Sequence, residues 1–106
     1  MAGWHRTAKW KRARVAALVA RDGPDCWLCT LPIPGRATRP GRRASLEHLE
    51  ARCRGGSDAL DNLVLCHDAC NRHLGGRPVE QKWQMREKWH RTAARRRAER
   101  ARAARG

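Results

Sequence analysis

The sequence has no phenylalanine or tyrosine and few acidic residues. Five tryptophans supply all of its aromatic side chains, and 24 lysines and arginines against 10 aspartates and glutamates give a net charge of +14. Such a charge predicts a polyanionic partner, with nucleic acid the leading candidate and an anionic membrane surface the rival. No stretch approaches the run of about 18 apolar residues that a membrane span requires. The composition therefore favours a nucleic-acid-binding protein.

The chain also lacks an apolar signal segment and an even number of cysteines. Lys9, Lys11, Arg12 and Arg14 interrupt the region where an apolar signal core would stand. We therefore expect a cytoplasmic protein, in which cysteines are more often metal ligands than disulfides, and five cysteines fit a disulfide framework poorly. With 106 residues, the chain forms one small domain that buries proportionally little surface, so a bound metal would add needed stability.

Two cysteine-containing segments have the spacing of a zinc site. Cys26 and Cys29 are separated by two residues, as in a tight turn that offers two thiolates to a tetrahedral ion. The second pair is either Cys66 with Cys70 or His67 with Cys70. The two-residue spacing favours His67 and leaves Cys66 as a small buried apolar residue, but both pairs stay open. Buried cysteines without a metal are the alternative for the whole set.

Apolar periodicity and turn residues predict a mixed α and β chain. The elements expected are a basic helix, two short strands, a short helix and a second basic helix. Beyond residue 91 the sequence is mainly alanine and arginine without an apolar face, and we expect it to become helical only on a polyanion. In chain order, the expected elements are a helix at 7–21, strands at 44–49 and 62–66, a short helix at 68–74, and a second basic helix that begins at 77–80.

A set of polar residues suited to phosphodiester hydrolysis lies on and between these strands and the short helix. The carboxylate of Glu47 and the amide oxygen of Asn71 are hard ligands of the kind that Mg²⁺ prefers. The imidazole of His48 is able to take a proton from water near neutral pH. Adjacent strand residues point to opposite faces, so Glu47 and His48 serve one site only if the strand ends or bulges there. We predict such an irregularity.

These segments together resemble a known family. The order Cys-x-x-Cys, Glu-His, Gly-Gly-Ser-Asp, Asp-Asn-Leu-Val-Leu and His-x-x-Cys-Asn is similar to that of the HNH endonucleases, a branch of the His-Me finger (ββα-metal) nucleases. The resemblance covers about residues 22–78. It implies a small, zinc-stabilised α+β domain of the ββα-metal type, flanked by basic N- and C-terminal helices. We expect a helix in 1–22, the nuclease core in 23–78, and a basic helix or tail in 79–106.

The resemblance also implies roles for individual residues. His48 stands at the general base, Asn62 at the residue that orients the loop carrying this histidine, and Glu47 and Asn71 at the ligands of a catalytic Mg²⁺ or Mn²⁺. His73 is a further candidate for that ion or for a phosphate. The structural zinc positions are Cys26, Cys29, His67 and Cys70, and the family's register supports His67 over Cys66. The expected nucleic-acid contacts are Arg42, Arg43, Arg54, Arg72 and Arg77.

This sequence departs from the family pattern at three places. A glutamate precedes the histidine where aspartate is more frequent, and its longer side chain would shift the ion. The zinc set contains one histidine where four cysteines are more frequent, and His73 stands where lysine is common. The residue in the third motif position is Asn71, so the chain would be of the HNN type.

The sequence thus predicts a metal-dependent endonuclease that hydrolyses DNA and leaves 3′-hydroxyl and 5′-phosphate ends. The expected cofactors are a structural Zn²⁺ and a catalytic Mg²⁺ or Mn²⁺. DNA is the expected partner, with no small-molecule substrate and no membrane, for a monomer or weak dimer in the cytoplasm of a bacterium or a phage-infected cell. The alternatives are a non-catalytic zinc module that binds nucleic acid and a small basic RNA-associated protein.

Overall fold

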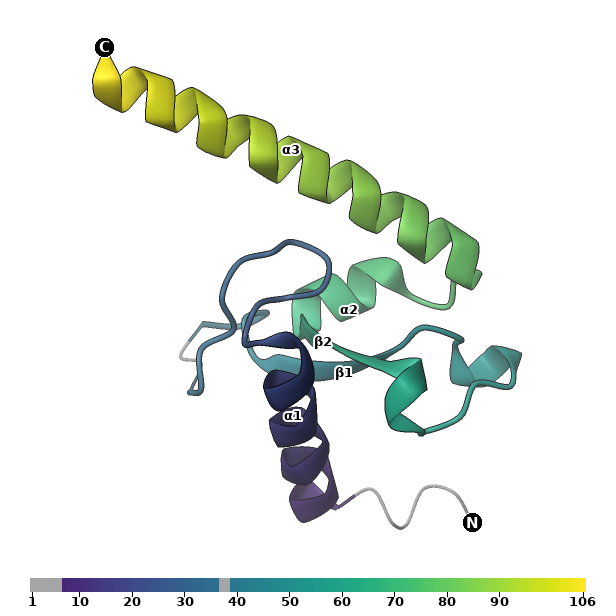
Figure 1. Cartoon of the computed structure of the whole chain (residues 1–106). Coiled ribbons are helices and arrows are strands. Elements are labelled where there is room, and N and C mark those ends of the chain that lie inside the picture. Colours follow the sequence, from purple (N-terminus) through teal and green to yellow (C-terminus); the bar gives the residue numbers. More distant parts are fainter. Residues whose placement is uncertain (1–6, 37–38) are drawn as a thin grey trace.

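The computed structural model describes residues 7–36 and 39–106, and residues 1–6 of the predicted N-terminal segment lie outside this part. Its elements are three α-helices, two strands and two short 3₁₀ turns (Figure 1). The α-helices are α1 (Ala8–Asp22), α2 (Asp68–Leu74) and α3 (Val79–Arg105), the strands are β1 (Ala44–His48) and β2 (Leu63–His67), and the 3₁₀ turns are η1 (Arg52–Arg54) and η2 (Leu60–Asn62).

The two strands form an antiparallel hairpin with a regular register. Ala44 pairs with His67 at one end and His48 pairs with Leu63 at the other, without a bulge between them. β1 ends at His48, but Glu47 and His48 are both paired with β2 in this register, so the predicted bulge is absent and their side chains leave the strand on opposite faces. All five residues of β2 are buried, which shows that both of its faces are covered by other elements.

Helices α1 and α2 both pack on this hairpin. Thr7 caps the start of α1 by accepting a hydrogen bond from the backbone N–H of Trp10, and Gly23 ends the helix with a φ of 90°. Leu18 of α1 and Leu74 of α2 are fully buried in the core. Both helices lie within one residue of the predicted ranges.

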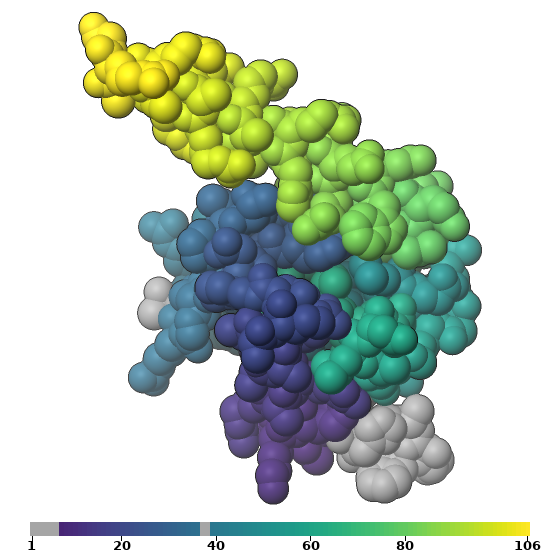
Figure 2. All heavy atoms as spheres, in the orientation of Figure 1, coloured from purple at the N-terminus to yellow at the C-terminus, as the bar shows by residue number. Residues whose placement is uncertain are grey.

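Helix α3 differs from its prediction over its C-terminal half. It runs unbroken for 27 residues, and its last turns extend beyond the rest of the molecule (Figures 1 and 2). With this helix, the whole molecule measures 59 × 30 × 25 Å. Met85 and Trp89 pack against the core. Because these contacts already hold the first turns, the costly nucleation step is complete, and alanine and arginine, both strong helix formers, continue the helix.

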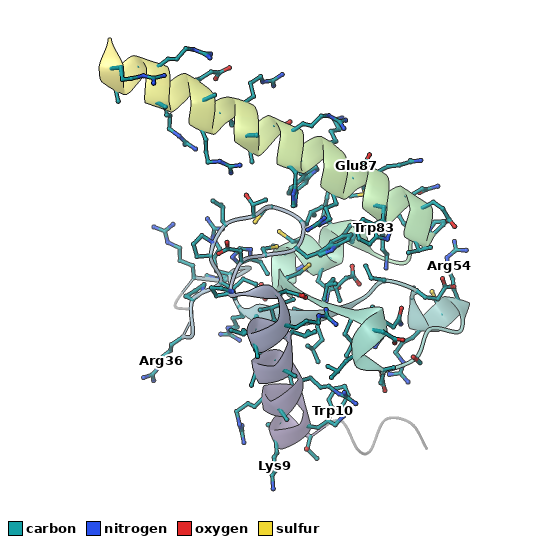
Figure 3. All side chains as sticks on the ribbon, in the orientation of Figure 1. Lys9, Trp10, Arg36, Arg54, Trp83 and Glu87 are labelled. Carbon is teal, nitrogen blue, oxygen red and sulfur yellow. The ribbon has the colours of Figure 1, made fainter. Side chains whose placement is uncertain are left out.

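No helix in residues 7–36 and 39–106 combines the length and apolar character needed to cross a bilayer. Charged side chains instead project outward, among them Lys9 on α1, Arg36 in the loop before β1, and Arg54 on η1 (Figure 3).

Candidate active site and metal centre

The predicted zinc ligands come together from two segments. Trp27 donates its backbone N–H to the carbonyl of Leu65 at 2.8 Å, which fixes the turn at 26–29 against β2. The second pair follows where β2 passes directly into α2. One ligand atom from each of four residues lies within 4.8 Å of the others. Two bonds of about 2.0–2.3 Å at the tetrahedral angle span about 3.3–3.8 Å, so the group would contract by up to about 1 Å around a Zn²⁺. This Cys₃His cluster consists of Cys26, Cys29, His67 and Cys70.

Hydrogen bonding sets the tautomer of His67 for metal binding. Its Nε2 lies 3.1 Å from the carbonyl oxygen of Pro32, and because a carbonyl only accepts, Nε2 carries the proton. Nδ1 is then the unprotonated nitrogen, and it faces the sulfurs of Cys29 at 3.4 Å and Cys70 at 4.0 Å. A backbone carbonyl that orients a histidine in this way is typical of zinc sites.

The cluster's sulfurs also have the chemistry of a cation site. Hydrogen bonds from the thiols of Cys66 and Cys70 lower the pKa of Cys26, and the same contacts raise the pKa values of those two thiols. Only one thiolate is therefore favoured without a metal, because neighbouring thiolates repel one another. A divalent ion would allow all three cysteines of the cluster to ionise. Cys66 is outside the four-residue group and fully buried in the core, so the cluster could hold zinc through His67.

The second predicted site lies where β1 ends. His48 is at the last position of the strand, and its Nε2 lies 2.8 Å from Oδ1 of Asp58. Because a carboxylate only accepts, Nε2 carries a proton, and in the neutral form of the ring the lone pair is then on Nδ1. Both side chains are largely buried, with 14% of the His48 side chain and 21% of the Asp58 side chain exposed.

Asn62 braces the loop that carries His48 and Asp58. Its Oδ1 accepts from the backbone N–H of Glu50 at 2.8 Å, and its Nδ2 donates to the carbonyls of Glu50 at 3.1 Å and Ser57 at 2.8 Å. The loop is also closed by its glycines. Gly55 adopts a φ of 90°, and a Cβ on Gly56 would lie 1.7 Å from the Glu50 carbonyl oxygen. The Gly-Gly pair is thus required by backbone geometry.

Glu47 is buried beside a lysine. Only 3% of the residue is exposed, and Oε1 lies 3.5 Å from the ammonium of Lys82, which is itself fully buried. Oε2 is also buried and has no hydrogen-bond partner among the described residues. Burial raises the pKa of Glu47 to about 7, and Lys82 opposes this shift.

Asn71 reaches from α2 to the same strand. Its Nδ2 donates to the hydroxyl of Ser45 at 2.8 Å and to the carbonyl of Leu46 at 3.0 Å. Ser45 and Glu47 lie two residues apart on β1, so their side chains share a face. The amide oxygen of Asn71 remains as a hard donor near this face. An unpartnered carboxylate oxygen and an amide oxygen fit a Mg²⁺-type ion by their chemistry.

The remaining predicted residues surround these centres at the surface. His73 is exposed and lies beside Trp89, with 5.3 Å between ring centroids. Arg54 donates to the carbonyl of Gly76, and Arg77 donates to the carbonyls of His73 and Leu74 at the end of α2. The predicted nucleic-acid contacts are all exposed: Arg42, Arg43, Arg54, Arg72 and Arg77.

Sequence reasoning missed Asp58 and Lys82. Asp58 belongs to the Gly-Gly-Ser-Asp segment, but nothing local reveals that it meets a histidine ten residues earlier. The position of Lys82 in the sequence was a weak indication of its role. Lys82 stands three residues after Val79 and three before Met85, on the apolar side of α3, where a lysine is out of place.

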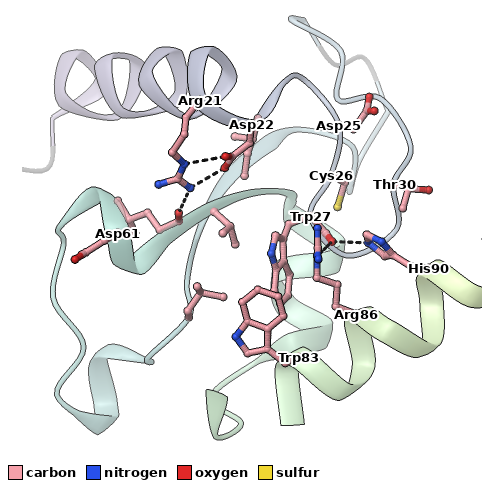
Figure 4. Close-up of a pocket in the computed structure, with 14 residues that line it drawn as sticks. Arg21, Asp22, Asp25, Cys26, Trp27, Thr30, Asp61, Trp83, Arg86 and His90 are labelled. Atoms are coloured by element: carbon pink, nitrogen blue, oxygen red, sulfur yellow. Dashed lines mark hydrogen bonds and ion pairs between the residues drawn. The ribbon is translucent and has the colours of Figure 1, made fainter. Parts of the chain in front are cut away.

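A separate groove of 710 Å³ lies between the end of α1, the 26–29 turn, β2 and α3 (Figure 4). Arg86 crosses it and donates to the Trp27 carbonyl at 3.0 Å, with its guanidinium over the Trp27 and Trp83 rings. Three aspartates line the groove together with Arg21 and Arg86, and neither His48 nor Asn71 does. Because Arg21 is paired with Asp22 and Arg86 is bonded to the Trp27 carbonyl, this groove suits a packing role better than phosphate binding.

Comparison with known proteins agrees with this arrangement. Residues 26–77 match the family model of the HNH endonucleases. No curated protein and no solved structure matches the chain significantly. The matched range contains the four residues of the Cys₃His cluster, both strands and α2, and the family implies a nuclease-like function on nucleic acid in general terms. Residues 26–77, which adopt a small α+β fold around two antiparallel strands, are therefore an HNH endonuclease domain.

Proposed function

We propose that the protein is a metal-dependent endonuclease that hydrolyses phosphodiester bonds of DNA and leaves 3′-hydroxyl and 5′-phosphate ends. The observation that carries the proposal is the 2.8 Å contact between His48 and Asp58 at the end of β1. This contact gives the imidazole a defined tautomer and a fixed orientation, which are the two requirements for a general base. Family membership over residues 26–77 supports the same reaction class.

His48 acts on water through Nδ1. Nε2 donates to Asp58, so the lone pair on Nδ1 takes the proton as water attacks phosphorus. The ring then carries a positive charge, which the carboxylate of Asp58 stabilises at close range. Asn62 keeps this geometry by fastening both ends of the loop to one side chain, through Glu50 and Ser57.

Glu47 and Asn71 would hold the catalytic Mg²⁺ or Mn²⁺. The buried Oε2 of Glu47 and the amide oxygen of Asn71 are the donors that suit it. When bound, such an ion stabilises negative charge on the phosphate and on the leaving 3′-oxygen. His73 remains a second candidate for phosphate contact, since it is exposed on α2 two residues after Asn71.

The rest of the chain supports this core, which we assign to residues 23–78. A structural Zn²⁺ in the Cys₃His cluster would join the 26–29 turn to β2 and α2. The basic helices α1 and α3 flank the core in the N-terminal 1–22 and C-terminal 79–106 segments, over Ala8–Asp22 and Val79–Arg105. The cysteines of the described part are free thiols, which suits the reducing cytoplasm of a bacterial or phage-infected cell.

Affinity for DNA would come mainly from the backbone. The contacts we propose are Arg42, Arg43, Arg54, Arg72 and Arg77, all of which are exposed. Arginine–phosphate contacts carry affinity without sequence information, so we expect weak sequence preference and strong salt dependence. A monomer would nick one strand, whereas paired cuts would require two copies related by two-fold symmetry.

The test is relaxation of supercoiled plasmid by the wild type and by His48→Ala, in Mg²⁺, in Mn²⁺ and in EDTA. The wild type should nick the plasmid with either ion and not in EDTA. His48→Ala should lose at least about 100-fold of the rate, the usual contribution of a general base, while zinc content and DNA affinity stay unchanged. Cleavage that survives the substitution would rule out His48 as the base.

A non-catalytic zinc module that binds nucleic acid is the second candidate. The observation that favours it is that both members of the acid–histidine pair have partners within the fold, Lys82 for Glu47 and Asp58 for His48. Such a module would bind the plasmid with the same salt dependence and leave it supercoiled in every ion. The same experiment therefore separates the two candidates.

A further inference from the structure

Lys82 is a buried lysine in the first turns of α3, outside the residues that match the family model. Its side chain is fully buried, and its ammonium donates to the His48 carbonyl at 2.7 Å and lies 3.5 Å from Oε1 of Glu47. Burying an ammonium is costly unless it is paired and hydrogen-bonded. A methionine or leucine would anchor α3 without this cost, so packing alone does not account for a lysine here.

The two contacts of Lys82 fall on the two adjacent residues of the proposed site. One fixes the main chain of His48 at the point where β1 ends, and the other fixes the side chain of Glu47. Leu46 and His48 lie two residues apart on β1, so their carbonyls point the same way. Asn71 takes the Leu46 carbonyl and Lys82 takes the His48 carbonyl. α2 and α3 thus hold the same edge of the strand.

The contact with Lys82 involves only one of the two carboxylate oxygens of Glu47. Oε1 is engaged by the ammonium, and Oε2 is left without a partner among the described residues. Without the ammonium, the buried carboxylate would have no counter-charge, which favours its protonation or its turning toward water, and either change removes it as an anionic ligand. Lys82 therefore keeps the side chain inward, with Oε2 buried and not engaged by any described residue.

We propose that Lys82 is a positioning residue of the cation site, which holds Glu47 so that its second oxygen is presented to the ion and fixes the backbone at His48. This inference rests on the proposed function, because Glu47 is a ligand only there. It assigns a role at the site to α3, which the 26–77 match does not include.

Lys82 could instead weaken metal binding, and the two roles predict opposite changes in metal affinity when Lys82 is replaced. An ammonium repels a divalent cation, so a lysine that merely competed for Glu47 would weaken metal binding. Removing its charge would then tighten binding. A positioning role predicts that removing Lys82 weakens binding, because the ligand itself is lost from the site.

The experiment measures Mn²⁺ binding to the zinc-loaded protein by electron paramagnetic resonance, without DNA. The variants are Lys82→Met, which keeps length without charge, and Lys82→Gln, which serves if the Met variant does not fold. Lys88→Met is the matched control, since Lys88 is exposed on the same helix and the change in net charge is equal. Zinc content and helicity by circular dichroism report folding. Plasmid nicking in Mg²⁺ is measured in parallel.

We expect Mn²⁺ to bind Lys82→Met about 10-fold or more weakly than wild type, the loss typical when an outer partner of a metal ligand is removed. The nicking kcat should fall while KM for plasmid stays unchanged, and Lys88→Met should match wild type. Equal or tighter Mn²⁺ binding by folded Lys82→Met would overturn the inference, as would a wild type that binds no Mn²⁺. If wild type binds Mn²⁺ but leaves plasmid intact, the proposed nuclease fails while the metal measurement still decides the role of Lys82.

Discussion

At the scale of single residues, the proposed site consists of pairs drawn from different segments. His48 on β1 meets Asp58 in the following loop, and Glu47 on β1 meets Lys82 on α3. Each pair places a charged or polar group in a largely buried setting, where electrostatic interactions are stronger than in water. Substituting Asp58 or Lys82 therefore tests the role proposed for its partner, His48 or Glu47.

Asp58→Asn should reduce cleavage while leaving the fold intact. The asparagine oxygen still accepts from Nε2 of His48, so the tautomer survives, but the carboxylate charge that would stabilise a protonated ring is removed. We expect kcat to fall by about 10–100-fold, as for other residues that orient an imidazole. Asp61→Asn is the control, because Asp61 is exposed three residues away and the charge change is the same. Equal losses in both variants would point to net charge instead.

Glu47 should make the stability of the metal-free catalytic site depend on pH. Burial raises its pKa from 4.5 to about 7. The folded state then holds a proton that the unfolded state has released, so the contribution is fully present below about pH 4.5 and is lost as pH rises through 7. The zinc-loaded wild type should therefore lose stability relative to Glu47→Gln between pH 5 and pH 8, by about 1–3 kcal/mol.

Urea unfolding of both proteins across this pH range, without Mg²⁺ or Mn²⁺, measures the difference. Glu47→Gln is the reference because it keeps the shape of the side chain and does not titrate. A difference that stays constant with pH would show that Glu47 titrates at its ordinary value. A difference of opposite sign would show that Lys82 outweighs burial.

At the scale of elements, the Cys₃His cluster joins a turn to the junction of a strand and a helix. The 26–29 turn is fixed to β2 through Trp27 and to α3 through Arg86 and His90, which both contact the Trp27 carbonyl at 3.0 Å. Zinc bound here would hold three elements whose own apolar contacts are few in so small a domain.

Zinc content of substituted proteins checks which residues form the cluster. His67→Ala should bind zinc much more weakly and unfold at lower urea concentration, because one of four ligands is gone. Cys66→Ala should keep one zinc per chain, since Cys66 is packed in the core and outside the four-residue group. Strong chelation of wild type should reproduce the His67→Ala behaviour. Loss of zinc from Cys66→Ala with retention in His67→Ala would reverse the assignment.

The sequence allowed the local elements to be predicted and the long-range pairs only in part. The strands and α1 agree with their predicted ranges to about one residue, because apolar spacing and glycine stops act locally. The Cys₃His cluster could be predicted from two pairs with two-residue spacing, Cys26 with Cys29 and His67 with Cys70. Asp58 and Lys82 could not be found, because their partners lie 10 and about 35 residues away and only the tertiary fold brings them together. The prediction that the chain beyond residue 91 is helical only on a polyanion was wrong, because it did not consider that the first turns of α3 are anchored on the core.

At the scale of the whole molecule, α3 gives the protein its elongated shape. Residues 91–105 contain seven arginines and one glutamate, and this part of the helix extends past the core (Figure 2). A rigid basic helix of this kind matches the repeated charge of a nucleic-acid backbone. It also contributes much of the chain's net charge of +14.

Replacing Arg95, Arg96 and Arg97 by glutamine should weaken DNA binding and flatten its salt dependence. For every phosphate that the variant no longer neutralises, the slope of log affinity against log salt should fall in magnitude by about 0.9. Fluorescence anisotropy of a labelled duplex over a range of KCl concentrations measures the slope. The control replaces the same residues by lysine, which keeps the charge and should keep the slope. An unchanged slope in the glutamine variant would exclude this part of α3 from the interface.

The packing of α3 on the 26–29 turn can be followed by tryptophan spectroscopy. Trp27 and Trp83 come from these two segments, and their rings meet edge to face with 5.1 Å between centroids. With no tyrosine or phenylalanine in the chain, near-ultraviolet dichroism and emission arise almost wholly from indoles. Two transition dipoles this close couple, so lifting the helix from the turn would erase a spectral signature without any label.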